Sequence, residues 1–68
     1  MEEIRITSEF IKLDAFLKFV GIAETGGYAK ILIQDGEVKV DGEICEMRGK
    51  KLYPGMIVEA SGRSCKVV

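Results

Sequence analysis

Residues 36–42 read Gly-Glu-Val-Lys-Val-Asp-Gly, and the hydrophobic period of the chain changes at this point. Val38 and Val40 alternate with charged residues, which is the two-residue period of a strand with one buried face. The Asp41–Gly42 pair that follows is a strong hairpin signal, because tight hairpin turns need residues that accept a positive φ. The stretch therefore predicts a strand that turns back on itself, with Ile44 and Met47 on the returning strand.

Upstream of this stretch the sequence has the 3.6-residue period of helices. A first helix is predicted over residues 9–20, with Thr7 or Ser8 as its N-cap. One face of it carries Phe10, Leu13, Phe16, Leu17 and Val20. A second helix is predicted over residues 27–34, capped by Thr25 and ended by Gly36. A short strand over residues 3–7 precedes both helices.

Downstream, turns separate a run of short strands. A basic turn at residues 48–51 and a Pro54–Gly55 turn are followed by a strand over residues 57–60. A Ser61–Gly62 reversal then leads into a last strand over residues 65–68. This order predicts one α+β domain over residues 1–68, with two helices on one face of a small, mostly antiparallel sheet of four to five strands.

Composition argues against several classes of protein. No apolar run approaches the roughly 20 residues that cross a bilayer, and the N-terminus lacks the features of a signal peptide, so we expect a cytoplasmic protein without membrane contact. Histidine is absent, and Cys45 and Cys65 form no CxxC pair, so neither a metal site nor a disulfide is expected. No serine or cysteine has a visible base partner, so no catalysis, cofactor or small-molecule substrate is expected.

Three motifs together carry a resemblance to a known family. They are Lys12-Leu13-Asp14-x-x-Leu17-x-x-x-Gly21, Ala29-Lys30-x-Leu32-Ile33-x-x-Gly36-x-Val38-x-Val40-Asp41-Gly42, and Pro54-Gly55-Met56-Ile57. Over residues 12–60 the chain resembles the alpha-L RNA-binding domain of small-subunit ribosomal protein S-four, many pseudouridine synthases, bacterial tyrosyl-tRNA synthetases and a heat-shock ribosome-associated protein. Its length and the Thr25-Gly26-Gly27 sequence are similar to the short, stand-alone bacterial group named YaaA or YbcJ. The resemblance implies a non-catalytic domain that binds structured RNA, ribosomal or tRNA-like, or ribosomal particles.

The resemblance also implies which residues contact RNA, through the two helices and the loop leading into the sheet. Lys12 stands where the family usually has the arginine of an Arg-Leu-Asp motif, and Thr25 where a serine caps the second helix. Lys30 matches the basic residue after the motif alanine, and Asp41 replaces a frequent asparagine in the hairpin turn.

Two departures from the family pattern bear on affinity and on the kind of RNA. Met56 replaces a usual aspartate, and Gly26 replaces the arginine that usually follows the serine, which removes a bidentate phosphate donor. Gly26 and Gly27 could offset this loss, because glycines at a helix start leave backbone amides open to a phosphate. The alternative is that both glycines only permit a tight turn between the helices.

Because the net charge is −1, RNA binding requires the basic residues to converge in space. Residues 48–51, Arg-Gly-Lys-Lys, are the densest basic stretch, and Lys39 is expected to join it; the alternative is a solubilising turn that balances Glu43 and Glu46. Aromatic stacking on bases is not expected, since the phenylalanines fall in helical stripes and are expected in the core, and nothing pairs Tyr28 with Tyr53. The predicted RNA-binding residues are Lys12, Thr25, Gly26, Gly27, Lys30, Lys39, Arg48, Lys50 and Lys51.

A rival hypothesis is a protein-interaction module. This hypothesis is supported by a second apolar stripe on the first helix, formed by Ile11, Ala15 and Phe19. It is also supported by an acidic rim expected opposite the basic turn at residues 48–51. The acids of that rim are Asp35, Glu37, Asp41, Glu43 and Glu46. Solvent exposure of Phe19 would favour this rival, and burial would favour RNA binding. A third, weaker alternative is a domain whose motif persists for folding alone.

Overall fold

The computed structural model describes all residues, 1–68. The elements in chain order are β1 (Glu2–Ile4), β2 (Ile11–Lys12), α1 (Leu13–Phe19), α2 (Gly26–Gln34), β3 (Lys39–Val40), β4 (Glu43–Ile44), β5 (Lys51–Leu52), β6 (Ile57–Ala60) and β7 (Arg63–Val67). Five strands form a sheet in the order β1-β7-β6-β3-β4, in which only the β1–β7 pair is parallel. Strands β2 and β5 form a separate antiparallel ribbon.

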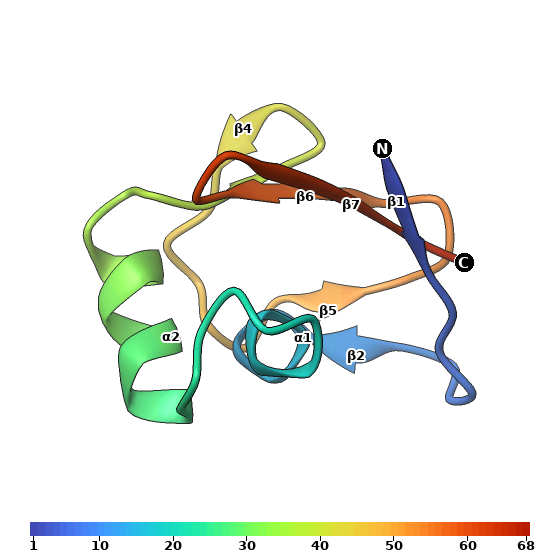
Figure 1. Cartoon of the computed structure of the whole chain (residues 1–68), viewed down its shortest axis with the longest axis horizontal. Coiled ribbons are helices and arrows are strands. Elements are labelled where there is room, and N and C mark those ends of the chain that lie inside the picture. The colour runs from blue at the N-terminus through green and yellow to red at the C-terminus, as the bar shows by residue number, and fades with distance from the viewer.

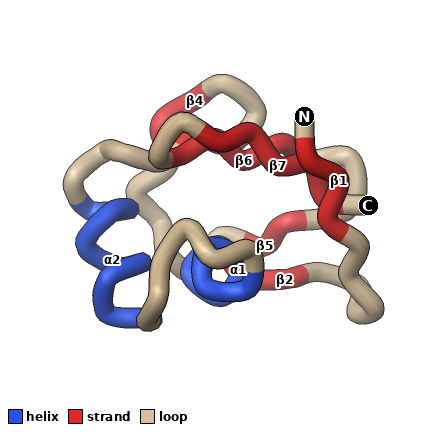
Figure 2. Tube along the Cα trace, in the orientation of Figure 1, coloured by secondary structure: helices blue, strands red, loops and turns tan.

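The molecule has two layers. Both helices and the β2–β5 ribbon lie on one side of the five-stranded sheet (Figure 1). The loop between β4 and β5 crosses from the sheet to the helical layer, as the tan tube in Figure 2 shows. The predicted α+β class, with two helices on one face of a mostly antiparallel sheet, is confirmed. No helix has the length and apolar character needed to span a bilayer.

Fourteen buried side chains fill the space between the layers, and none of them is polar or charged. Helix α1 contributes Leu13, Phe16 and Leu17, whose spacing of three and four residues places them on one face. Helix α2 contributes Ala29, Leu32 and Ile33 by the same rule. From the sheet side, Val38 and Val40 are buried as their alternation predicts.

The prediction that the first helix starts at residue 9 is wrong. Residues 11 and 12 form strand β2, and α1 begins only at Leu13. The amide of Leu13 donates to the carbonyl of Lys50 at 2.9 Å, and that of Asp14 donates to the carbonyl of Arg48 at 3.1 Å. Because the loop before β5 supplies acceptors for these amides, no capping side chain is needed, and α1 has none.

The surroundings of two phenylalanines, Phe10 and Phe19, differ from the prediction. Phe10 lies outside the helix and is only partly buried, whereas Phe16 is fully buried. The second stripe of α1 is not covered, since Ala15 is exposed and Phe19 is 62% exposed. The helix packs through one face only, so the expectation that its phenylalanines all belong to the core is wrong for Phe19.

The second helix follows its prediction closely. It starts at Gly26, one residue earlier than expected, and the Oγ1 of Thr25 accepts the amide of Tyr28 at 3.0 Å. At the other end Gly36 has a φ of 74°, a conformation that favours glycine. The amide of Glu37 then donates to the carbonyl of Leu32 at 3.1 Å, which closes the helix.

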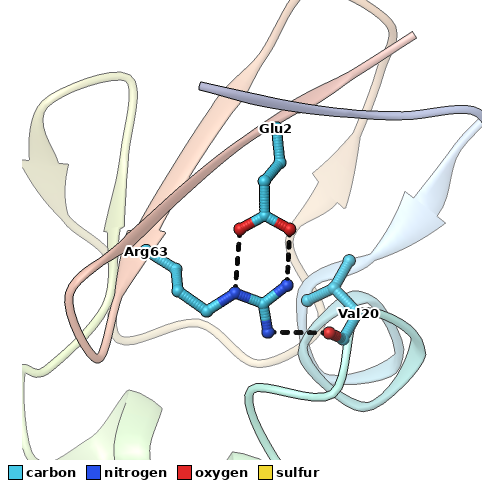
Figure 3. A network of polar contacts seen from close by, with 3 residues as sticks. All are labelled: Glu2, Val20 and Arg63. Atoms are coloured by element: carbon cyan, nitrogen blue, oxygen red, sulfur yellow. Dashed lines mark hydrogen bonds and ion pairs between the residues drawn. The ribbon is translucent and has the colours of Figure 1, made fainter.

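Arg63 ties the end of α1 to the edge of the sheet (Figure 3). Its Nη1 donates to the carbonyl of Val20 at 2.8 Å, while Nε and Nη2 donate to the Glu2 carboxylate at 2.9 and 2.6 Å. These bonds connect strand β7, the end of α1 and the edge strand β1. The predicted strand over residues 3–7 is shorter, Glu2–Ile4, because only these residues pair with β7.

Candidate nucleic-acid interface

Four basic residues gather around the start of α1. Lys12 occupies the N-cap position of this helix. The loop that carries Arg48 and Lys50 is fixed to the same end of α1 by the two carbonyl groups that accept its first amides. Lys51 begins strand β5, directly after this loop. We call Lys12, Arg48, Lys50 and Lys51 the basic cluster; local sequence alone places only the last three together.

Within the basic cluster, Lys12 and Lys51 stand directly opposite each other in the β2–β5 ribbon. Both side chains are exposed, and like charges opposite each other on neighbouring strands destabilise a sheet. Lys12 also precedes a helix start, where a cation is disfavoured by the helix dipole. Neither lysine has a carboxylate partner, since the one ion pair of the molecule joins Arg63 to Glu2. An anion bound here would relieve this repulsion.

The start of α2 presents unpaired backbone amides. Thr25 accepts the amide of Tyr28, but no carbonyl within the helix can reach the amides of Gly26 and Gly27 in the first turn. Neither glycine has a positive φ. An added Cβ would meet nothing within 4 Å at Gly26, and only the Thr25 Oγ1 at 3.9 Å at Gly27. Steric need therefore does not explain these two glycines, and the space beside their amides is open to an anion.

The two groups of candidate residues follow opposite ends of α1 along the chain. The basic cluster surrounds its first residue, and the connection that leads to Thr25 leaves from its last. The six residues 20–25 connect the last residue of α1 to the start of α2. Lys30 is exposed one turn into α2 and belongs to the second group.

Lys39 lies apart from the basic cluster. It is opposite Glu59 in the β3–β6 pair and lines a hollow together with Glu37, Glu59 and Arg63. Two acids, Glu37 and Glu59, therefore lie near Lys39, although neither forms an ion pair with it. The structure does not bring Lys39 to residues 48–51, because Lys39 lines a hollow with residues of β6 and β7, whereas Lys50 lines a different one.

The acidic side chains are not all on the opposite rim. Asp41, Glu43 and Glu46 line one hollow with Lys50, so they border the basic cluster. The expected separation of acids from the basic loop is therefore wrong for these three. Asp41 also has a structural role, because its Oδ1 accepts the amide of Ile57 at 2.9 Å.

The residues with potential nucleophilic or metal-binding chemistry form no site. Cys65 is buried in β7, and burial raises the pKa of its thiol, which favours the uncharged form. Cys45 is partly buried in the loop after β4, and both cysteines are free. No group of three or more Cys, Asp or Glu side chains is arranged to hold a metal ion.

Comparison with known proteins identifies the family. The family model described as S4 domain matches residues 4–68, nearly the whole chain. The chain belongs to the S4 domain family. The resemblance carried by the three sequence motifs is thereby confirmed.

Relatives of this S4 domain are bacterial. It is 42% identical to the probable ribosome maturation protein RlbA of Bacillus subtilis (strain 168), covering 87% of this chain and 83% of RlbA. It is 40% identical to the putative RNA-binding protein YbcJ of Escherichia coli (strain K12), covering 85% of this chain and 83% of YbcJ. The solution structure of E. coli YbcJ, described as revealing an alpha-L motif involved in RNA binding, aligns with a TM-score of 0.75 at 35% identity, over 100% of this chain and 87% of the other.

The S4 domain contains an aromatic pair that the sequence analysis missed. The rings of Phe10 and Tyr53 have centroids 5.9 Å apart and are tilted by 48°. The Nζ of Lys51 lies 4.8 Å from the centroid of the Phe10 ring. Tyr53 therefore has an aromatic neighbour, which is Phe10 and not Tyr28. The helical pattern over residues 9–20 does not reveal this pair, because Phe10 precedes strand β2 instead of lying on α1.

Proposed function

We propose that this S4 domain binds structured RNA, ribosomal or ribosome-associated, and holds its sugar–phosphate backbone without catalysing a reaction. The observation that carries the proposal is the basic cluster, in which Lys12 and Lys51 face each other with no acidic partner. The printed names of the relatives RlbA and YbcJ, which refer to ribosome maturation and RNA binding, support it. A cytoplasmic location accords with this function.

The two groups at the ends of α1 would contact the backbone differently. Arg48 can hold a phosphate through two parallel hydrogen bonds, while the lysines act as mobile point charges. The amides of Gly26 and Gly27, with Lys30 nearby, would donate hydrogen bonds to a second phosphate at the positive end of α2. This arrangement would compensate for the missing arginine at position 26. Lys39 contributes less, because Glu37 and Glu59 offset its charge.

The dependence of affinity on salt tests this mechanism. If about four phosphates are contacted, log K for a fragment of ribosomal RNA should fall against log salt with a slope of about −3 to −4. The measurement is a titration by fluorescence anisotropy at several salt concentrations. An affinity that hardly changes with salt would contradict backbone-phosphate binding.

The exposure of Phe19 favours a second function, protein docking. Its side chain is 62% exposed. With Ile11, Arg5 and Ile6 it lines a hollow of about 330 Å³, although Ile11 lies on β2 rather than on α1. A partner seated there would cover apolar surface that this chain leaves open.

The variant Phe19→Asn separates the two functions. We expect it to keep its affinity for the RNA fragment, because Phe19 is outside both basic groups. If Phe19 docks a ribosomal protein, the variant should sediment less with ribosomal particles than the wild type does. Equal sedimentation of the two proteins would refute the docking function while leaving RNA binding intact.

A further inference from the structure

The outward face of the β2–β5 ribbon and its continuation carries two lysines, Lys12 and Lys51, and two aromatic residues, Phe10 and Tyr53. The register pairs Ile11 with Leu52 and Lys12 with Lys51. Side chains alternate along a strand, and Leu52 is buried while both lysines are exposed. One residue further along the same register, Phe10 meets Tyr53, and their ring contact confirms this continuation.

The alternation places the aromatic pair and the lysine pair on the same face. Residues two apart on a strand are separated by about 7 Å, so the rings lie next to the lysine side chains. The 4.8 Å approach of the Lys51 Nζ to the Phe10 ring shows this proximity directly. An apolar stacking surface thus adjoins two uncompensated positive charges.

Local hydrogen bonds fix the backbone of both aromatic residues. The Oγ of Ser8 donates to the carbonyl of Phe10 at 2.8 Å. The carbonyl of Tyr53 accepts the amide of Met56 at 3.1 Å across the Pro54–Gly55 turn. Tyr53 is 39% exposed although it packs against Phe10, so part of its ring remains open to solvent.

We propose that this face, Phe10, Lys12, Lys51 and Tyr53, binds one unpaired nucleotide of an RNA. The base stacks on the ring of Tyr53, against which Phe10 forms a side wall, and the adjoining phosphate lies between Lys12 and Lys51. Stacking of this kind tolerates any base, because every base has a π face. The inference rests on the proposed RNA-binding function and deepens it, since it predicts a preference for RNA with unpaired nucleotides over a continuous duplex.

Two variants of Tyr53 test the stacking. The probes are a hairpin RNA with an adenosine loop and a fully paired duplex with the same stem sequence. Tyr53→Leu keeps an apolar side chain but removes the ring, and should weaken binding of the hairpin about tenfold and of the duplex less than about twofold. Tyr53→Phe keeps the ring and should bind both RNAs as the wild type does.

A second measurement leaves Tyr53 unchanged. The chain has two tyrosines and no tryptophan, so Tyr28→Phe leaves Tyr53 as the single tyrosine emitter. Stacking should quench its fluorescence when the hairpin is added, and the duplex should quench it far less.

The outcomes separate this inference from the proposed function. Equal loss of hairpin and duplex affinity in Tyr53→Leu, no loss at all, or no selective quenching would overturn the stacking site while leaving phosphate binding intact. If the wild type binds neither RNA, both the stacking site and the RNA-binding function are wrong.

Discussion

Lys12 and Lys51 are paired residues of neighbouring strands, and they bring two positive charges together on an exposed surface. Nothing in the fold neutralises them, since no carboxylate forms an ion pair with either one. A like-charged cross-strand pair costs folding free energy, so its presence has its best explanation in a function that needs the charge. Removal of one of these charges should therefore raise the free energy of unfolding and weaken the affinity for RNA.

Replacing Lys12 tests this opposition. Lys12→Gln removes the repulsion and should raise the free energy of unfolding by about 0.2–1 kcal/mol, as measured by urea denaturation. The same variant should bind RNA more weakly. Lys12→Arg, which restores the residue usual in the family, should keep both the repulsion and the affinity. A loss of stability in Lys12→Gln would show that the pair is not repulsive.

Charge reversal in the basic loop should abolish most RNA binding. Lys50→Glu with Lys51→Glu changes the charge of the basic cluster by four and should weaken affinity at least about tenfold. Circular dichroism should show an intact fold, because the carbonyl of Lys50, not its side chain, caps α1. Lys18→Glu with Lys66→Glu has the same change in charge at other positions and should retain much more affinity. Similar losses in both double variants would point to overall charge rather than to this loop.

The Glu2–Arg63 pair should make stability depend on pH in the acid range. Hydrogen bonds from the Arg63 guanidinium hold the pKa of the Glu2 carboxyl below its usual value. The bond therefore stabilises the fold fully above the pKa of an unfolded glutamate, about 4.3, and this contribution is lost as the pH falls through the lower pKa of the folded protein. Glu2→Gln should lower the Tm at neutral pH, and its difference from the wild type should shrink in acid. Glu3→Gln, whose exposed carboxylate has no such partner, should lack this pattern.

Asp41 should stabilise the hairpin turn through its side-chain acceptor and its tolerance of a positive φ, and not through its negative charge. It has a φ of 51°, and its amide and its Oδ1 both bond to Ile57, at 2.8 Å to the carbonyl and 2.9 Å to the amide. Asp41→Ala loses the side-chain acceptor and strains the left-handed backbone, and should reduce the free energy of unfolding by about 1–2 kcal/mol. Asp41→Asn keeps the acceptor and tolerates this φ, so its stability should stay within about 0.5 kcal/mol of the wild type. Urea denaturation of both variants measures the difference.

Elements stabilised by neighbours in sequence were predictable. Helix α2, its Thr25 cap and the Asp41–Gly42 hairpin depend on contacts within a few residues, and all three are present. The α+β class follows from the order of such elements. The densest basic stretch, residues 48–51, was also recognisable from its composition.

The arrangement of the candidate site depended on tertiary structure. A two-residue strand such as β2 has no periodicity of its own and exists because residues 51 and 52, far along the chain, pair with it. That pairing moves the start of α1 to Leu13, faces Lys12 with Lys51 and brings Phe10 to Tyr53. Local patterning thus determined which elements form, whereas long-range pairing decided which side chains meet, because backbone hydrogen bonds between distant segments leave no periodic trace in the sequence.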